Sequence, residues 1–162
     1  MDELDALCMQ AKHPLEILPA LGGLGAPYWN FSLTPVIKGI TDITTPADWV
    51  AGLTHGIALL IADIVNYMRA YQIIPHGKTT VSGGLSQSNY LMQFQADVLQ
   101  RTLARTAQPE ETLAGACALA GMTNFSNDIQ EKSFLPQISS FKANEIYEKW
   151  QTFVKECNAR VL

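Results

Sequence analysis

The chain has 162 residues, of which 48% are hydrophobic and 16% are charged. This is the composition of an ordinary globular domain with enough apolar material for a core. Its formal net charge of −4 argues against a nucleic-acid-binding protein, which carries a basic face. The three cysteines, Cys8, Cys117 and Cys157, are widely spaced, so neither a disulfide framework nor a zinc site is expected. We therefore expect a reducing, cytoplasmic setting.

Signal peptides and membrane spans are not expected either. The first four residues are Met-Asp-Glu-Leu, which are too acidic and too short of apolar residues for a secretory signal. The richest apolar stretch, residues 57–65, contains Asp63 and is far shorter than a membrane span.

The first forty residues predict short elements around a glycine-rich loop. This loop ends in Tyr28 and Trp29, and we expect the two rings to anchor it on the core rather than to contact a ligand. The short elements are a helix and two strands, at residues 2–11, 15–18 and 35–40.

A long helix is predicted over residues 46–71. Thr45 is a good N-cap, Pro46 suits the first helical position, and Asp48 stands where a capping box has an acid. Large apolar side chains recur at steps of three and four and form one stripe. They are Trp49, Leu53, Ile57, Leu60, Ile61, Ile64, Met68 and Tyr71.

The second half of the chain alternates between predicted strands and helices. Strands are predicted at 78–82 and 102–107, and helices at 88–100, at 109–121 (opened by Pro109 and Glu110) and at 143–158, with a loop at 123–140. This alternation favours an α/β layer architecture, although the strand count is low for a free-standing sheet.

The most informative sequence is the strand that runs into Gly83 and Gly84 and then into a helix. A glycine pair lets the backbone turn sharply and approach a ligand, and the N-terminus of the next helix favours phosphate. Ser86, Gln87 and Ser88 add polar side chains. A tight connection without a ligand is an equally good interpretation of this spacing, since the pattern is neither a P-loop nor a GxGxxG fingerprint.

Four motifs, in order, resemble the FGGY family of carbohydrate kinases, and most closely its glycerol kinase branch. They are Gly22 to Trp29 (GGLGAPYW), Gly39-Ile40 before the long helix, Val81 to Gly84 with Asn89 to Asp97 (NYLMQFQAD), and Glu110, Gly115, Ala116 and Gly121. The resemblance covers about residues 15–122. Ser82, Asn30 and His55 depart from it, because they stand where the family has Asp, Asp and Glu.

The resemblance implies a partial ribonuclease H-like (actin-like ATPase) fold, with a mixed sheet and flanking helices. It implies ATP as the bound cofactor, with Mg²⁺ held chiefly by the ATP phosphates. Gly84 would then contact the nucleotide near its ribose and phosphates, Gly83 would shape the turn, and Ser88 would take the place of an Asn on the adenine. Gly115, with Ser86 and Gln87, would lie beside the nucleotide. No catalytic residue and no metal ligand is assigned, because the family's catalytic Asp and substrate residues precede the matched region.

Residues 1–162 are thus predicted to be part of an FGGY kinase C-terminal domain, without the N-terminal domain and the first strands of its own domain. The implied function is transfer of the ATP γ-phosphoryl group to a polyol or sugar, with glycerol as the main prediction, and the chain alone is expected to be inactive. A pentose or gluconate kinase of the same family and a non-catalytic interaction fragment remain alternatives. The expected partners are the kinase's N-terminal domain and the small-molecule substrate, with no nucleic acid and no membrane. A homo-oligomer is left open.

Several polar residues are interpreted as structural. His55 is expected at the surface or boundary of the long helix, Asp63 on a solvated or N–H-bonded face, and Asp97 as a structural acid. The charged residues of the last helix, which include Glu145 and Lys149, are expected to form a solvated face.

Overall fold

A computed structural model describes residues 1–73, 79–106, 111–121 and 132–159 of the chain. Its elements follow one another as α1 (Asp2–Gln10), β1 (Glu16–Leu18), β2 (Val36–Lys38), α2 (Pro46–Ala70), β3 (Thr79–Val81), the 3₁₀ turn η1 (Gly84–Gln87), α3 (Asn89–Leu99), β4 (Leu103–Arg105), α4 (Glu111–Leu119), β5 (Lys132–Phe134) and α5 (Ser140–Ala159). The alternation predicted from the sequence is therefore confirmed for the described residues.

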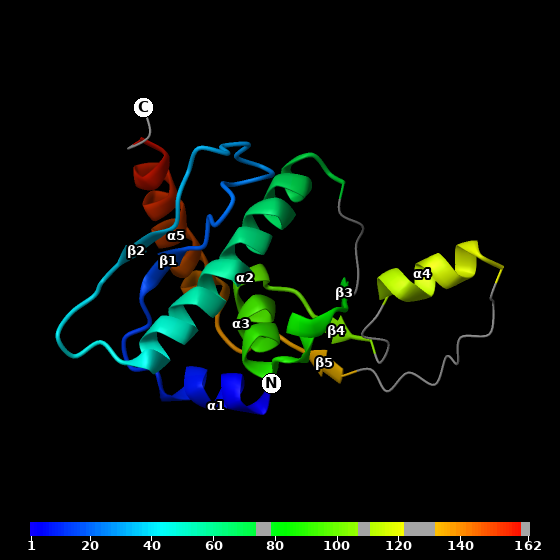
Figure 1. The fold of residues 1–162 in the computed structure, drawn as a ribbon, viewed down its shortest axis with the longest axis horizontal. Helices are drawn as coiled ribbons and strands as arrows, with labels where there is room; N and C mark the ends of the chain where they lie inside the picture. Colours follow the sequence, from blue (N-terminus) through cyan, green and yellow to red (C-terminus); the bar gives the residue numbers. More distant parts are fainter. Residues whose placement is uncertain (74–78, 107–110, 122–131, 160–162) are drawn as a thin grey trace.

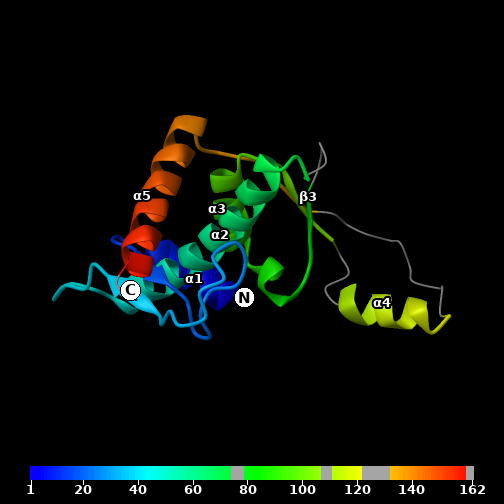
Figure 2. The ribbon, with the colours of Figure 1, turned by 90° about the horizontal axis from the view of Figure 1, so that it is seen from above.

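The strands form two small sheets. β1 pairs with β2 in an antiparallel hairpin, and the second sheet has the order β3-β4-β5. β3 is parallel to β4, whereas β5 is antiparallel to it, so this sheet is mixed, as predicted. α2 and α3 lie side by side in the middle of the molecule, with α1 below them and α5 beside them (Figure 1). α4 extends away from all the other helices (Figures 1 and 2).

The core lies between α2, α3, α5 and the sheet strands. Leu18 of β1, Leu99 of α3, Leu103 of β4 and Val154 of α5 are almost wholly buried in it. Burial of such side chains stabilises the fold by roughly 1.5–3 kcal/mol each relative to leaving them exposed.

The start of α2 confirms the predicted capping box. Thr45 Oγ1 accepts a bond from the Asp48 N–H, and the Asp48 carboxylate accepts one from the Thr45 N–H at 2.9 Å. The same carboxylate also accepts the N–H groups of Lys12 and His13, at 3.0 and 2.7 Å. The bonds from Thr45, with those from His13 and Lys12, lower the pKa of Asp48 to about 2. One acid therefore starts α2 and fastens the α1–β1 connection to it.

The face that α2 buries differs from its predicted apolar stripe. None of the eight stripe residues is fully buried, and Trp49, Leu53, Ile64 and Tyr71 are exposed. The buried face consists mainly of small residues, including Ala51, Gly52, Gly56, Ala58 and Ala62. A Cβ at Gly52 or Gly56 would collide with the carbonyl oxygen of Leu15 or Ile17, so α2 packs against the backbone of β1. Close helix-to-strand packing selects small side chains, which a search for large apolar ones overlooks.

Two local predictions need correction, and a third falls on residues that the structure does not describe. The predicted loop at 123–140 contains β5 and the first residue of α5, while residues 122–131 lie outside the described part of the chain. Pro109 and Glu110 also lie outside it. Trp29 does not anchor its loop, because it is 68% exposed and contacts Phe31 edge to face at 6.3 Å.

By length and composition α2 is long and apolar enough to cross a membrane, which the shorter apolar run in the sequence did not suggest. Half of its most apolar window is buried inside the fold, so this is weak evidence, because the core helix of a globular domain passes the same test.

Candidate functional site

The Gly83–Gly84 turn follows β3 and leads into the 3₁₀ turn η1. Gly83 has φ = 93°, a conformation that favours glycine, whereas Gly84 does not have a positive φ. No heavy atom lies within 4 Å of the place where a Cβ would stand on either residue, and Gly84 is exposed. The turn therefore presents bare backbone to open space, which is the property that a close-approaching ligand requires.

The turn η1 is held in place by hydrogen bonds from the side chains of Ser86 and Arg105. Ser86 is buried, and its hydroxyl donates to the Gly83 carbonyl at 2.7 Å. The Arg105 guanidinium, at the end of β4, donates to the carbonyls of Ser86 and Gln87 at 3.0 and 3.1 Å. It also lies 5.6 Å from the ring centre of Phe134 in β5. Arg105 was not identified from the sequence, where it is only a charged residue in a predicted strand.

Ser88 caps α3 and is fully buried. Its hydroxyl oxygen accepts the Leu91 N–H at 3.1 Å, and its O–H donates to the carboxylate of Asp5 at 2.5 Å. The other carboxylate oxygen of Asp5 accepts the Asn89 N–H at 2.8 Å. Asp5 belongs to α1, so a residue more than 80 positions away occupies the start of α3. Contact between Ser88 and an adenine remains a prediction, and in this conformation the hydroxyl is already used by two partners.

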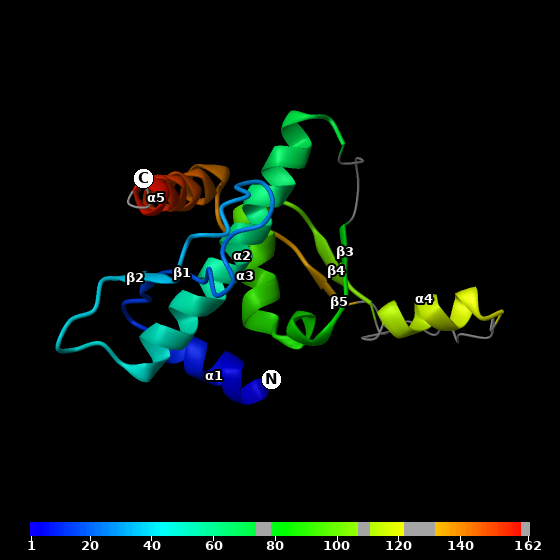
Figure 3. The same cartoon turned by 45° about the horizontal axis from the view of Figure 1, so that its top comes forward.

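Gly115 and Gln87 differ in how they relate to the turn. Gln87 ends η1 and is exposed, so it stands beside the glycine pair. Gly115 is exposed on α4, and no heavy atom lies within 4 Å of the place where its Cβ would stand. Figure 3 shows α4 apart from α3 and the sheet, so the structure does not bring Gly115 to the turn. The position of Gly115 beside a nucleotide therefore stays a prediction.

A buried network at Asp63 fixes the glycine-rich loop to α5. Its carboxylate accepts the Tyr28 hydroxyl at 2.8 Å, the Trp150 indole N–H at 2.8 Å and the Gln151 amide at 2.6 Å. Burial raises the pKa of Asp63, and these bonds oppose that shift. Burial, with the nearby Asp63 charge, also raises the pKa of Tyr28. Tyr28 is therefore the loop anchor that was predicted, and Asp63 is an N–H-bonded structural acid.

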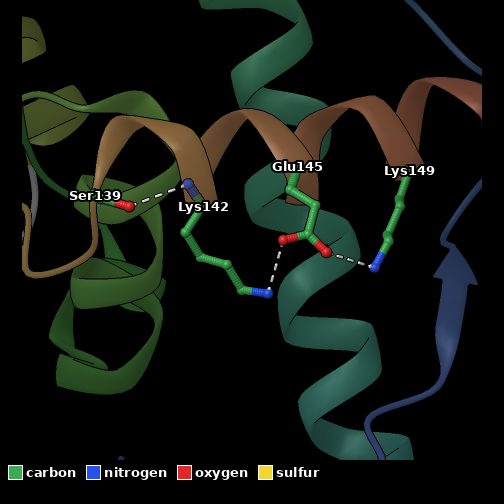
Figure 4. Close-up of polar contacts among 4 residues, drawn as sticks. All are labelled: Ser139, Lys142, Glu145 and Lys149. Atoms are coloured by element: carbon green, nitrogen blue, oxygen red, sulfur yellow. Dashed lines mark hydrogen bonds and ion pairs between the residues drawn. The ribbon is translucent and has the colours of Figure 1, made fainter.

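Asp97 and the last helix also behave as predicted. Asp97 accepts the Gln93 amide at 3.0 Å and the Gln137 N–H at 2.6 Å, so it joins α3 to the start of the α5 segment. On α5, Glu145 bonds to both Lys142 and Lys149, at 3.0 and 2.9 Å, on a solvated face (Figure 4). The hydrogen bond from Lys149, followed by that from Lys142, lowers the pKa of Glu145, and the charges of both lysines act in the same direction.

The described residues hold no group of three or more His, Cys, Asp or Glu side chains that could bind a metal ion. Two cations do lie near the turn: Arg105 bonds to η1, and Lys132 Nζ donates to the Asn89 side chain at 2.8 Å. The positive charge and the open backbone of the turn suit an anionic ligand such as a phosphate group, whereas the N-terminus of α3 is already occupied by the Asp5 carboxylate. These residues fit a nucleotide whose own phosphates carry the metal.

The chain matches the family described as "FGGY family of carbohydrate kinases, C-terminal domain" over residues 1–124. It is 33% identical over 154 residues to a glycerol kinase of Lactobacillus acidophilus, with 90% of this chain and 31% of that protein covered. It is 36% identical over 144 residues to a glycerol kinase of Limosilactobacillus reuteri, with 83% and 29% covered. The chain thus spans about a third of the length of the curated relatives it matches.

Solved structures of this family share the fold. A Plasmodium falciparum glycerol kinase with ADP superposes with a TM-score of 0.79 at 20% identity, covering 96% of this chain and 33% of that one. A xylulose kinase from Rhodospirillum rubrum gives 0.75 at 20% identity, covering 98% and 34%. The α/β fold with a mixed sheet is therefore that of FGGY kinases, as predicted from the motifs. The chain belongs to the FGGY family of carbohydrate kinases, and it matches their C-terminal domain.

Proposed function

We propose that this chain is the nucleotide-binding C-terminal part of an ATP-dependent kinase that phosphorylates glycerol. The observation that carries the proposal is the open Gly83–Gly84 backbone inside a chain 33–36% identical to glycerol kinases. Xylulose and gluconate kinases share the fold at about 20% identity, so a pentose or gluconate substrate is the second candidate. A cytoplasmic setting, predicted from the cysteines, goes with either.

In the proposed site, Gly84 and the backbone that follows it face the ribose and phosphates of ATP. The amides of Gly84 and Leu85 open η1, so they have no acceptor within it and can donate to phosphate oxygen. Arg105 keeps these amides in place through the carbonyls of η1. Bound ATP would supply the transferable phosphoryl group, with Mg²⁺ on its phosphates. Phosphoryl transfer depends mainly on positioning and charge stabilisation, which a rigid turn supports.

We also propose that residues 1–162 form only part of the C-terminal domain and act with an N-terminal domain that supplies the catalytic aspartate and the polyol site. Two features support this. β3 pairs with β4 alone among the described strands, so its other edge is open. Beside that edge, a hollow of about 310 Å³ is lined by β3, by α3, and by Val65 of α2 together with Ile57 and Ile61 of the α2 stripe. Additional strands would cover these apolar surfaces.

The proposed nucleotide site can be tested by NMR on the ¹⁵N-labelled 162-residue chain. Addition of ADP or of ATP with Mg²⁺ should shift the backbone amides of Gly83, Gly84 and Gln87 in a saturable manner. The affinity should be millimolar, about −4 kcal/mol, because part of the site's surroundings is absent. Gly84 and Gln87 amides that do not respond at about 10 mM nucleotide would contradict the site.

The proposed reaction needs a separate measurement. The chain alone should give no ATP-dependent phosphorylation of glycerol above the blank in a coupled assay, with preparations free of host kinase. The kinase that contains this chain together with an N-terminal domain should have its highest kcat/KM with glycerol among glycerol, xylulose and gluconate. A preference for xylulose or gluconate would replace glycerol as the substrate and would leave the nucleotide site untouched.

A further inference from the structure

A second pocket lies on the other side of α2 from the open edge of β3. It has a volume of about 430 Å³ and is enclosed by β1, α2, α3 and α5. Its walls are mainly apolar and aromatic, and they include Ile17, Leu59, Phe94, Trp150 and Phe153. No residue of the Gly83–Gly84 turn or of η1 lines it, so it is separate from the proposed nucleotide site. A volume and lining of this kind are typical of sites for small molecules.

His55 gives this pocket an uncharged aromatic wall. Its ring stacks on Phe94 with ring centres 3.9 Å apart, and its Nε2 lies 2.9 Å from the Tyr90 hydroxyl. Burial lowers the pKa of His55 to about 4. The imidazole is therefore neutral at pH 7 and does not repel a cation. The sequence placed His55 at the surface or boundary of α2, and the structure places it half-buried against this pocket.

The mouth of the pocket is acidic. An adjoining hollow of about 430 Å³ shares Glu16, Lys149 and Phe153 with the pocket. It is lined by four glutamates and two lysines: Glu16, Glu145, Glu148, Glu156, Lys38 and Lys149. Both lysines are already paired, Lys149 with Glu145 and Lys38 with Glu156 (Figure 4 shows the first of these pairs). Glu16 and Glu148 form no ion pair with a described residue, so the charge left over at the mouth is negative.

Phe153 at this mouth already has an ammonium group against its ring. The Lys38 Nζ lies 5.0 Å from the centre of the Phe153 ring, within the range of a cation–π contact. The same ring lines both the pocket and the hollow. Because Lys38 already lies against this ring, a ligand whose apolar body filled the pocket would place its ammonium group at Glu16, which lines both hollows.

We propose that this pocket binds a small aromatic amine, with the ring between His55, Phe94 and Trp150 and the ammonium group at Glu16. The apolar walls select the body of the ligand, and the unpaired carboxylates select its charge. A carboxylate ligand of the same shape would meet Glu16 and Glu148 and be repelled. This inference does not depend on the proposed kinase function.

The test is an NMR titration of the 162-residue chain with phenethylamine and, separately, with its anionic analogue phenylacetate. Phenethylamine should shift the Gly52 and Gly56 amides and the Trp150 indole N–H in a saturable manner, and phenylacetate should bind about tenfold more weakly. Glu16→Gln should weaken phenethylamine binding about fivefold, because an exposed charge pair is lost. Glu3→Gln, an exposed glutamate on α1, is the matched control and should leave the affinity unchanged.

Three results would overturn the proposal. Phenylacetate binding as tightly as phenethylamine, or an equal affinity in the Glu16→Gln and Glu3→Gln chains, would remove the charge assignment. Failure of phenethylamine to saturate the Gly52, Gly56 and Trp150 shifts would remove the pocket as a site. Both substitutions are at exposed side chains, so the folded state is expected to persist in each variant.

Discussion

The bond between α1 and the start of α3 allows a direct test of how this turn is built. Asp5→Ala removes a carboxylate that is 8% exposed and accepts two bonds, from the Ser88 hydroxyl at 2.5 Å and from the Asn89 N–H at 2.8 Å. The Ser88 hydroxyl would keep its Leu91 N–H donor but would lose its own acceptor. The change therefore leaves a buried O–H group without a partner and weakens the N-terminus of α3.

The expected loss of stability follows from these two bonds. A buried donor left unsatisfied costs about 1–3 kcal/mol, and removal of a capping interaction costs about 0.5–2 kcal/mol. The carboxylate also sits at the positive end of the α3 dipole, a smaller contribution of the same sign. We expect Asp5→Ala to lower the free energy of unfolding by about 2–4 kcal/mol. Glu3→Ala, an exposed acid on the same helix, should change it by less than about 0.5 kcal/mol.

Urea denaturation followed by circular dichroism measures both variants at one pH. A double-mutant cycle with Ser88→Ala then isolates the bond between the two side chains, because the loss of the Asn89 N–H bond occurs in every Asp5→Ala variant and the loss of the Leu91 N–H bond occurs in every Ser88→Ala variant, so both cancel. The double variant should be less destabilised than the sum of the two single variants, by about 1–2 kcal/mol. If Asp5→Ala behaved like Glu3→Ala, or the two changes were additive, Asp5 would not be holding Ser88 and this account of the turn would be wrong.

Three further predictions concern single residues. Gly84→Val should keep the stability of the chain, since Gly84 has open space around it and no positive φ, but should weaken ADP binding by at least about tenfold in the NMR titration; an unchanged affinity would show that the turn is only a connection. The folded-state pKa of His55, about 4, lies below its unfolded value of about 6.5. The contribution of the neutral His55 ring to the free energy of unfolding is therefore complete above pH 6.5 and is lost as the pH falls toward 4. We expect a loss of about 2–3 kcal/mol at pH 4.5. Urea midpoints at pH 7 and 4.5 measure this loss, which His55→Gln should largely abolish. Gly56→Ala should destabilise the chain by about 1–3 kcal/mol, because the new Cβ overlaps the Ile17 carbonyl. Gly115→Ala, on exposed α4, is the control and should be neutral or stabilising by up to about 1 kcal/mol. Equal effects of the two substitutions on the urea denaturation curves would refute the close packing of α2 on β1.

The elements of the fold could be predicted well where local chemistry decides them. Thr45, Pro46 and Asp48 specify the start of α2 by bonds within four residues, and the structure shows the capping box they encode. β5 was missed because Lys132–Phe134 is a three-residue strand with little local preference. Its strand conformation depends on pairing with β4, which is a contact between distant parts of the chain.

The packing of α2 was the least predictable feature, for a physical reason. Periodicity identifies large apolar residues, and it assigned the stripe that begins at Trp49. The helix instead approaches the backbone of residues 15–17 so closely that Gly52 and Gly56 leave no room for a Cβ, and its buried face consists mainly of small residues. The sequence of α2 contains both a stripe of large apolar residues and a face of small residues. No local pattern tells which of these two faces packs against β1. Only the position of β1 decides between them.

The candidate site shows the same division between local and distant information. The glycine pair and its open backbone are local, so Gly83 and Gly84 could be proposed from the motif as a candidate site. The rigidity of the turn comes from elsewhere: Asp5 on α1 holds the start of α3, and Arg105 on β4 holds η1 through two carbonyls. A flexible glycine turn would lose conformational entropy on binding a phosphate, whereas a turn already fixed by these two side chains loses less. In the proposed site, the residues that fix the turn thus come from α1 and β4, and they become visible only when the helices and strands are placed together.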